Sequence, residues 1–283
     1  MKKGAAVLLV LTLSAGLTAC GSNNNAEVAA GGASAQAQQS QADLPAAKEL
    51  LDQAAKAGSG VKSYALQTEQ QETHSGETID SPDSRYTITS QITMEPPAAY
   101  QKIELELAGA MNDSNQLQKY ITSEAIYSAR SEQWYRDDKE LYETQANLRE
   151  FTNIAAQLQQ IQAAVNDMTV TGQGSSYILT GSVKDETARR QLTQMLLNQA
   201  SSYTPGMQRS IKLSTVEEMT ISYTLDAESK LPTASEATIR LASPLSDDET
   251  KSRITDMKIT AVYSDYDRIT AITVPEEVKA AAI

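Results

Sequence analysis

Strict alternation of apolar and polar residues is the sequence feature that most constrains the fold of this chain. In residues 86–94 and 101–107 apolar side chains alternate with polar ones, at Tyr86, Ile88, Ile92 and Met94 and at Ile103, Leu105 and Leu107; residues 219–225, 237–241 and 257–263 repeat the pattern. This two-residue period predicts antiparallel strands with one buried face and one solvated face. Because these strands share an apolar face, other elements of the chain must cover it.

Less regular strands are expected in five further places, at residues 119–129, 133–143, 168–171, 176–183 and 269–274. Gly172 and Gly174 separate the third and fourth of these segments, and glycines at such a position indicate a hairpin turn. The predicted strands therefore follow one another closely along the chain, as in an antiparallel sheet.

Helices are predicted where the apolar spacing changes to three and four residues. They are expected at residues 44–57, 148–165, 186–201 and 276–281. Asp43 is a suitable N-cap for the first of them, and Pro45 suits its first turn. This order of elements predicts an α+β fold, in which a strongly curved antiparallel sheet (a half-barrel) carries two or three helices on its concave face.

The amino terminus is typical of an export signal. Lys2 and Lys3 precede a short apolar run, and small residues then lead to Cys20. The sequence Leu17-Thr18-Ala19-Cys20 resembles the lipobox of bacterial lipoproteins. That resemblance implies a signal peptide at residues 1–19, cleavage before Cys20 and a thioether-linked diacylglyceryl group on its sulfur. An ordinary secreted protein with a stray cysteine is the alternative.

Residues 20–43 are expected to be the lipidated cysteine and a flexible tether. After Cys20 the segment contains two acidic residues, no basic residues and no aromatic residues, so it lacks apolar area to offset the entropy lost on ordering. Residues 44–283 are then expected to form a single domain. The predicted location is the outer face of the cell membrane, where two acyl chains suffice for stable anchoring.

The folded part resembles bacterial lipoproteins of LolA/LppX-like fold whose function is uncharacterised. The resemblance rests on the order of elements and on four short segments, at residues 61–64, 120–135, 223–226 and 272–278. It implies a carrier that holds a lipid or an acylated chain between sheet and helices. No residue of this chain matches a known cargo contact of such carriers.

The inward stripes are the candidate wall of an apolar pocket for that ligand. They comprise Tyr86, Ile88, Ile92, Met94, Ile103, Leu105, Trp134, Met195, Met219, Ile221, Tyr223, Met257 and Ile259. The same residues would equally serve as an ordinary filled core. In that case the chain is an interaction module that binds a protein or a wall polymer through an acidic outer face.

Composition excludes several other functions. The formal net charge is -12 at pH 7, which disfavours binding to nucleic acid through a basic surface. One Cys and one His allow neither a disulfide within the chain nor a Cys/His zinc site.

We expect no cofactor and no metal, because the acidic clusters at residues 247–249 and 265–267 lack the spacing of a calcium loop. His74 lies in a polar segment and is expected to be an exposed loop residue. No nucleophile motif is present, so no enzymatic activity is expected.

Overall fold

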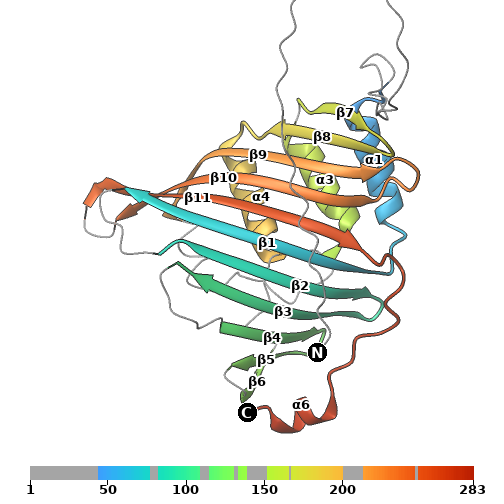
Figure 1. The fold of residues 1–283 in the computed structure, drawn as a ribbon, viewed down its shortest axis with the longest axis vertical. Helices are drawn as coiled ribbons and strands as arrows, with labels where there is room; N and C mark the ends of the chain where they lie inside the picture. The colour runs from blue at the N-terminus through green and yellow to red at the C-terminus, as the bar shows by residue number, and fades with distance from the viewer. Residues whose placement is uncertain are drawn as a thin grey trace, which may run out of the picture. The chain divides into compact units, whose positions relative to one another are not determined.

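The computed structural model describes residues 44–76, 82–108, 115–130, 133–138, 152–165, 167–199, 213–245 and 248–283. These residues form one antiparallel sheet of 11 strands (Figure 1), in the order β6-β5-β4-β3-β2-β1-β11-β10-β9-β8-β7. The sheet is curved. It is also open, because the edge strands β6 and β7 do not pair with each other. The α+β class expected from the sequence is confirmed.

The strands of the first half of the sheet are β1 (Ser63–Gly76), β2 (Ser84–Met94), β3 (Pro97–Leu107), β4 (Asn115–Thr122), β5 (Ala125–Arg130) and β6 (Gln133–Asp138). Those of the second half are β7 (Thr169–Gln173), β8 (Ser176–Ser182), β9 (Thr215–Asp226), β10 (Pro232–Leu245) and β11 (Asp248–Ser264). Each half follows the chain strand by strand. The two halves join where β1 pairs with β11, from Ala65 opposite Ser264 to Gly76 opposite Arg253.

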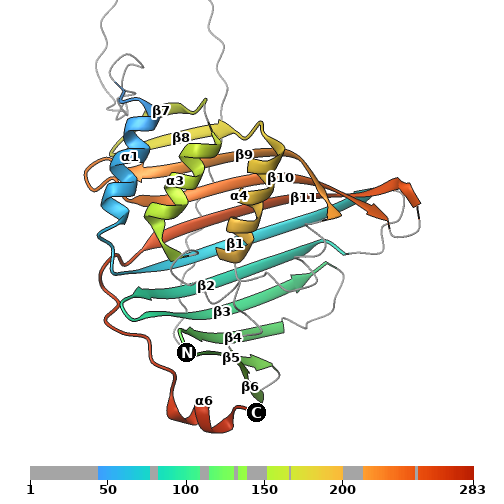
Figure 2. The same ribbon diagram turned by 180° about the vertical axis from the view of Figure 1, so that it is seen from behind.

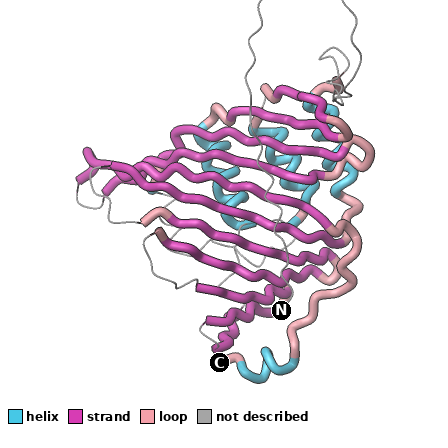
Figure 3. The backbone as a smooth tube through the Cα atoms, viewed as in Figure 1, coloured by secondary structure: helices cyan, strands magenta, loops and turns pink. Residues whose placement is uncertain are grey.

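Three helices cover one face of the sheet (Figures 2 and 3). They are α1 (Ala47–Gly58), α3 (Ile154–Ala164) and α4 (Glu186–Gln199). Helix α1 packs on α3, α3 packs on α4, and α4 packs against β9. We call the face that they cover the inner face; it is the concave face of the sheet. In Figure 2 the three helices lie across the second half of the sheet and reach β1.

The main core lies between these helices and the inner face. Leu50, Leu51 and Ala54 of α1 and Leu158 and Ile161 of α3 are almost completely buried there. Leu50 and Leu51 precede Ala54 by four and three residues, and Leu158 precedes Ile161 by three, so each helix presents one apolar stripe to the sheet. Facing them are Leu179, Ile221, Leu225, Ile239 and Ile259 from four strands of the second half. The inward residues of the alternating pattern thus form the core, as predicted.

A fourth helix, α6 (Glu276–Ala281), packs on the opposite face of the sheet near β6. Its Val278 forms a small apolar cluster with Val274, Ala125 and Tyr127. Ile283 then pairs with the edge strand: the Arg136 N–H donates to the Ile283 carbonyl oxygen (3.1 Å), and the Ile283 N–H donates to the Trp134 carbonyl oxygen (3.2 Å). These bonds occupy backbone groups that an edge strand otherwise exposes.

Two expectations about element boundaries were wrong. Residues 269–274 form no strand, because both neighbours of β1 and both neighbours of β11 in the sheet are already in place and leave no edge beside them. The first helix begins at Ala47 after an N-cap residue, Ala46, whose side chain makes no capping hydrogen bond.

The expected signal peptide, Cys20 and tether lie outside the described residues, as do residues 139–151 and 200–212. Within the described part of the chain, none of the helices is long and apolar enough to cross a membrane.

Candidate functional site: the inner face of the sheet

Most of the residues predicted to line a pocket lie in the main core under the helices. The group consists of Ile92, Met195, Met219, Ile221, Tyr223, Met257 and Ile259, with Met94 packed against it. Each of the seven is at most 5% exposed, so these side chains contact the helices and one another. The second half of the inner face is therefore a packed core.

A second group of predicted residues lies farther along the same face. Ile88 and Ile103 form an apolar cluster separate from the main core, with Tyr86 and Leu117 packed against it. Leu105 is opposite Tyr86 in the pairing of β2 with β3 and belongs to the same surface. This cluster spans β2, β3 and β4, beyond the strands that α1, α3 and α4 cover in Figure 2.

Trp134 does not share this surface. Strand pairing places it opposite Ala129, Ala129 opposite Gln118, and Gln118 opposite Lys102. Directly opposite residues point to the same side of a sheet, so Trp134 shares a face with Lys102. Lys102 and Ile103 are neighbours in β3 and point to opposite faces, so Trp134 lies on the face away from Ile103. There it contacts the cluster around Val278, and its ring lies 5.8 Å from that of Tyr120. The prediction that Trp134 points inward with the other stripe residues was therefore wrong, because the register of β6 on β5 places its side chain on the opposite face.

Sequence reasoning also missed a cluster of tyrosines at the end of β1. The ring of Tyr64 lies 6.2 Å from that of Tyr263 and 6.1 Å from that of Tyr266. The Tyr64 hydroxyl donates to the Thr152 carbonyl oxygen (2.9 Å), and the Tyr266 hydroxyl donates to that of Pro232 (2.6 Å). Burial raises the pKa of Tyr64 well above its usual value, and the neighbouring tyrosines add to the effect. The Tyr64 hydroxyl thus ties the start of β1 to the residue before the N-cap of α3, and the Tyr266 hydroxyl ties the turn after β11 to the start of β10.

Polar residues occupy the inner face at the other end of β1. Gln70 and Glu72 are buried, and Gln70 Nε2 donates to Glu72 Oε1 (2.5 Å). Ser84 on β2 donates to the other carboxylate oxygen, Glu72 Oε2 (3.3 Å). Burial raises the pKa of Tyr86, and the charge of Glu72 contributes to that shift. The Glu72 carboxylate is held by these two hydrogen bonds.

The prediction that His74 is an exposed loop residue was wrong. His74 lies in β1, half-buried, and its Nδ1 is 3.1 Å from Thr255 Oγ1 of β11. The polar segment around it reads as a loop, but β1 continues to Gly76 because β11 pairs with it throughout. His74 thus lies on the inner face beside the buried Thr255.

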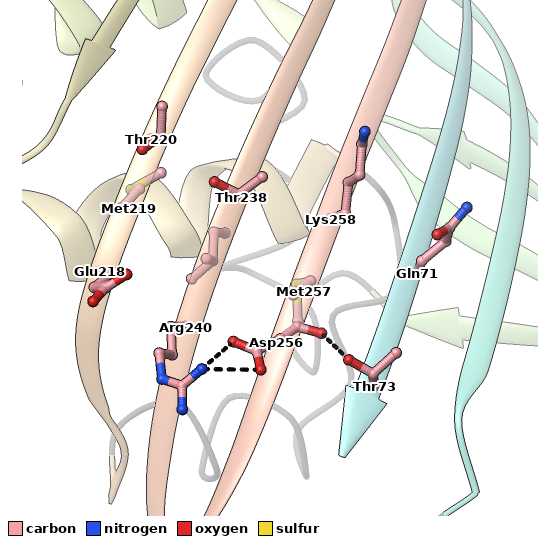
Figure 4. Close-up of a pocket in the computed structure, with 11 residues that line it drawn as sticks. Gln71, Thr73, Glu218, Met219, Thr220, Thr238, Arg240, Asp256, Met257 and Lys258 are labelled. Atoms are coloured by element: carbon pink, nitrogen blue, oxygen red, sulfur yellow. Dashed lines mark hydrogen bonds and ion pairs between the residues drawn. The ribbon is translucent and has the colours of Figure 1, made fainter. Parts of the chain in front are cut away.

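The outer face of the sheet is polar and carries cross-strand ion pairs. Figure 4 shows a shallow groove of about 260 Å³ across β9, β10, β11 and β1. In it Arg240 Nη1 donates to both carboxylate oxygens of Asp256 (2.9 and 3.1 Å). Arg240 also pairs with Glu217 (3.3 Å), and Lys258 pairs with Glu236 (3.0 Å). On these strands basic residues therefore stand beside the acidic ones.

Of the two acidic clusters, residues 265–267 belong to the described part of the chain, whereas Asp247 lies outside it. Within the described part, no set of three or more His, Cys, Asp or Glu side chains is placed to hold an ion. Asp265 and Asp267 are in left-handed conformations (φ 52° and 57°). Asp267 Oδ1 accepts from the backbone N–H of Lys62 (2.6 Å), so Asp267 ties the turn after β11 to the start of β1.

Comparison with solved structures finds distant similarities. LprF from Mycobacterium bovis has a TM-score of 0.47 at 10% identity, over 81% of this chain and 96% of that one. A LolA superfamily protein from Nitrosomonas europaea has a TM-score of 0.27 at 9% identity, over 83% and 97% of the two chains. No curated protein matches the chain. A family model described as a family of unknown function, DUF6612, matches residues 46–283.

Proposed function

The chain belongs to the DUF6612 family of unknown function, and we propose that it is a lipid-anchored protein of the bacterial envelope that binds an acyl-chain ligand on its inner face. The observation that carries this proposal is the second apolar cluster of Ile88 and Ile103. These side chains point to the concave side of the sheet beyond α1, α3 and α4, with Tyr86, Leu105 and Leu117 around them. Ile88 and Ile103 are 1% and 7% exposed, so an acyl chain would lie along the half-buried Tyr86, Leu105 and Leu117 beside them, gaining about 0.8 kcal/mol for each methylene group removed from water.

The sequence supports anchoring on the outer side of a membrane. Cys20 follows a short apolar segment in a lipobox-like context, and 26 residues rich in Ala, Gln, Asn and Ser separate it from α1. A tether of that length lets the sheet take up or release a ligand at the membrane surface while it stays attached. The ligand and the anchor would then come from the same membrane.

We propose a binding function in preference to catalysis. The chain has one His and one Cys, and Cys20 is assigned to the anchor. The sequence contains no nucleophile motif and no phosphate-binding glycine loop. The polar side chains described on the inner face include amides, hydroxyls, the Glu72 carboxylate, the His74 imidazole and the Lys119 ammonium group, all of which can bind and orient a ligand.

An interaction module with an acidic outer face is the alternative. It requires unpaired acidic groups on that face. Glu217, Glu236 and Asp256 are instead each paired with Arg240 or Lys258 across the strands. The charge pattern of the second half of the sheet therefore favours the ligand carrier.

Native mass spectrometry of the chain purified without detergent tests ligand binding. We expect copurified lipid on the wild-type protein and a several-fold lower occupancy in Leu117→Asp, because a charge in the apolar wall opposes an acyl chain. Gln118→Asp is the matched control, since Gln118 is also half-buried but points to the other face. A lipid-free wild-type protein, or equal occupancy in the two variants, contradicts the proposal.

Cell fractionation tests the anchor separately. Cys20→Ala is expected to abolish acyl labelling and to release the chain from membranes. Retention of unlabelled Cys20→Ala protein in the membrane fraction contradicts the anchor without bearing on ligand binding.

A further inference from the structure

A buried amide on β3 has one hydrogen-bonding atom without a partner. Gln101 is 6% exposed, and its Nε2 donates to Oγ of Ser90 on β2 (3.2 Å). Its Oε1 is buried and accepts no hydrogen bond from the part of the chain that the structure describes. Folded proteins rarely leave a buried polar atom unpaired, because its lost hydration is not repaid. This oxygen is therefore a position at which a bound group can supply the missing hydrogen bond.

Gln101 borders the second apolar cluster on the inner face. It shares a face with Ile103, two residues along β3, and such residues are about 7 Å apart. Ile103 is in turn opposite Ile88 on β2 and Leu117 on β4. An acyl chain that lies along this cluster in the direction of β3 therefore brings its polar end to Gln101.

The side chains beside Gln101 in the strand register have partners of their own. Lys119 on β4 is opposite Gln101 and already makes an interaction, and Ser128 on β5 donates to Asp137 Oδ2 (3.5 Å). Ser90 Oγ accepts from Gln101 itself. Of these side chains, Gln101 is the one with a buried atom whose bonding a ligand would complete.

The chemistry of this atom selects a neutral hydrogen-bond donor. An amide oxygen only accepts hydrogen bonds, and so does an ionised carboxylate, so an acyl chain that ends in a carboxylate does not satisfy it. A charged group also loses far more than a hydroxyl when it leaves water. A hydroxyl group supplies the donor at a smaller cost of desolvation.

We propose that Gln101 determines the specificity for the head of the acyl ligand, its Oε1 accepting a hydrogen bond from a hydroxyl group. The ligand is then a neutral acyl lipid with a free hydroxyl at its polar end. This inference rests on the proposed function, because a hydroxyl group reaches Gln101 only if the acyl chain lies on the second apolar cluster.

Displacement of Nile red, an uncharged apolar dye, from the full chain by oleyl alcohol and by methyl oleyl ether tests the proposal. The two ligands share the hydrocarbon chain and the head oxygen, but only the alcohol can donate a hydrogen bond. Because that bond satisfies a buried oxygen, the wild-type protein should bind the alcohol about tenfold more tightly than the ether.

Gln101→Met is expected to remove this preference. Methionine is unbranched like glutamine and has no amide oxygen, so the alcohol should bind at most about twofold more tightly than the ether. The ether should bind the variant as tightly as it binds the wild-type protein, which shows that the inner face is intact. Gln101→Leu removes the same oxygen with a different shape and should give the same result, so the test does not depend on the folding of one variant.

Gln118→Met is the matched control. Gln118 is half-buried on the neighbouring strand β4, points to the outer face and accepts from the Tyr100 hydroxyl (3.2 Å). This variant loses an amide of the same kind and should keep the preference for the alcohol.

Three results overturn the inference. Equal affinity of the wild-type protein for the alcohol and the ether is one. A preference that survives both Gln101 variants is another, because the size of the ether head then explains it. Loss of the preference in Gln118→Met as well is the third, because the effect is then not specific to Gln101. Failure of both ligands to displace Nile red rejects the proposed function together with the inference, whereas binding of both without preference rejects the inference alone.

Discussion

Gly181 on β8 is the position at which the packing of α3 on the sheet allows the least additional volume. A methyl group on Gly181 would lie 2.5 Å from Val165 Cγ1 and 2.9 Å from Met168 Cγ. Carbon atoms in good contact are about 3.5–4.0 Å apart, so Gly181→Ala forces an overlap of about 1 Å. Val165 is the C-cap residue of α3 and is 5% exposed, so the overlap pushes the end of the helix away from the sheet.

The expected cost of Gly181→Ala follows from two opposing terms. Overpacking a core costs about 1–3 kcal/mol, and replacing glycine by alanine returns about 0.4–1 kcal/mol through the unfolded chain. We therefore expect a loss of about 1–2 kcal/mol in the free energy of unfolding. Val165→Ala alone removes two buried methyl groups and should cost about 1.6 kcal/mol.

The double variant separates this explanation from a general intolerance of β8 to substitution. If the overlap with Val165 causes the loss, Gly181→Ala combined with Val165→Ala should be more stable than the sum of the single losses predicts, by about 1 kcal/mol. Guanidinium unfolding followed by circular dichroism measures each value, provided that the slope stays constant. Gly60→Ala is the control, because its nearest contact is an ordinary 3.6 Å. Wild-type stability of Gly181→Ala, or strict additivity, refutes the reasoning.

Two further expectations concern the tyrosine cluster and α6. Because burial raises the pKa of Tyr64, the native state disfavours its ionisation. The free energy of unfolding should keep this contribution below about pH 10 and decrease as the pH rises above it. Chemical unfolding at several alkaline pH values should show that the decrease is shallower for Tyr64→Phe than for the wild-type protein. An equal decrease in the two proteins would contradict this expectation. Val278→Asp should detach α6 and shift the fluorescence of Trp134, the single tryptophan of the chain, to longer wavelength, because Val278 is buried beside it. The exposed control Ala280→Asp should leave the spectrum unchanged, and a shift in the control as well would show that the spectrum does not report on α6.

Local pattern was enough to predict the strands and the helix stripes. Tyr86, Ile88 and Ile92 alternate with polar residues, and all three point to the inner face. The turn at residues 226–230 was also predictable: Asp226 Oδ1 accepts from the backbone N–H of Ser229 (2.7 Å), and Lys230 takes a left-handed conformation. In such places the residues that determine the structure are neighbours in the sequence.

Partner choice between distant segments could not be predicted. β1 continues through Glu72 and His74 because β11, nearly two hundred residues later, supplies its hydrogen bonds. The alternating apolar residues after position 268 look equally strand-like, but they find no free edge in the sheet. Gln70 and Glu72 point inward although they are polar, which the rule of apolar inward residues does not anticipate.

The order of strands explains why one sheet can serve both stability and binding. The strands that α1, α3 and α4 cover in Figure 2 belong mainly to the segment after residue 168, and their inward side chains are buried in the main core. The strands from β2 to β5 come from a separate, earlier segment, and their inner face carries both an apolar cluster and the buried, unpaired amide oxygen of Gln101. The unpaired oxygen costs about 1–3 kcal/mol, while the amide nitrogen of the same side chain donates to the buried Ser90 (3.2 Å). The position of Gln101 in the half of the sheet beyond these helices is explained if that half binds a ligand.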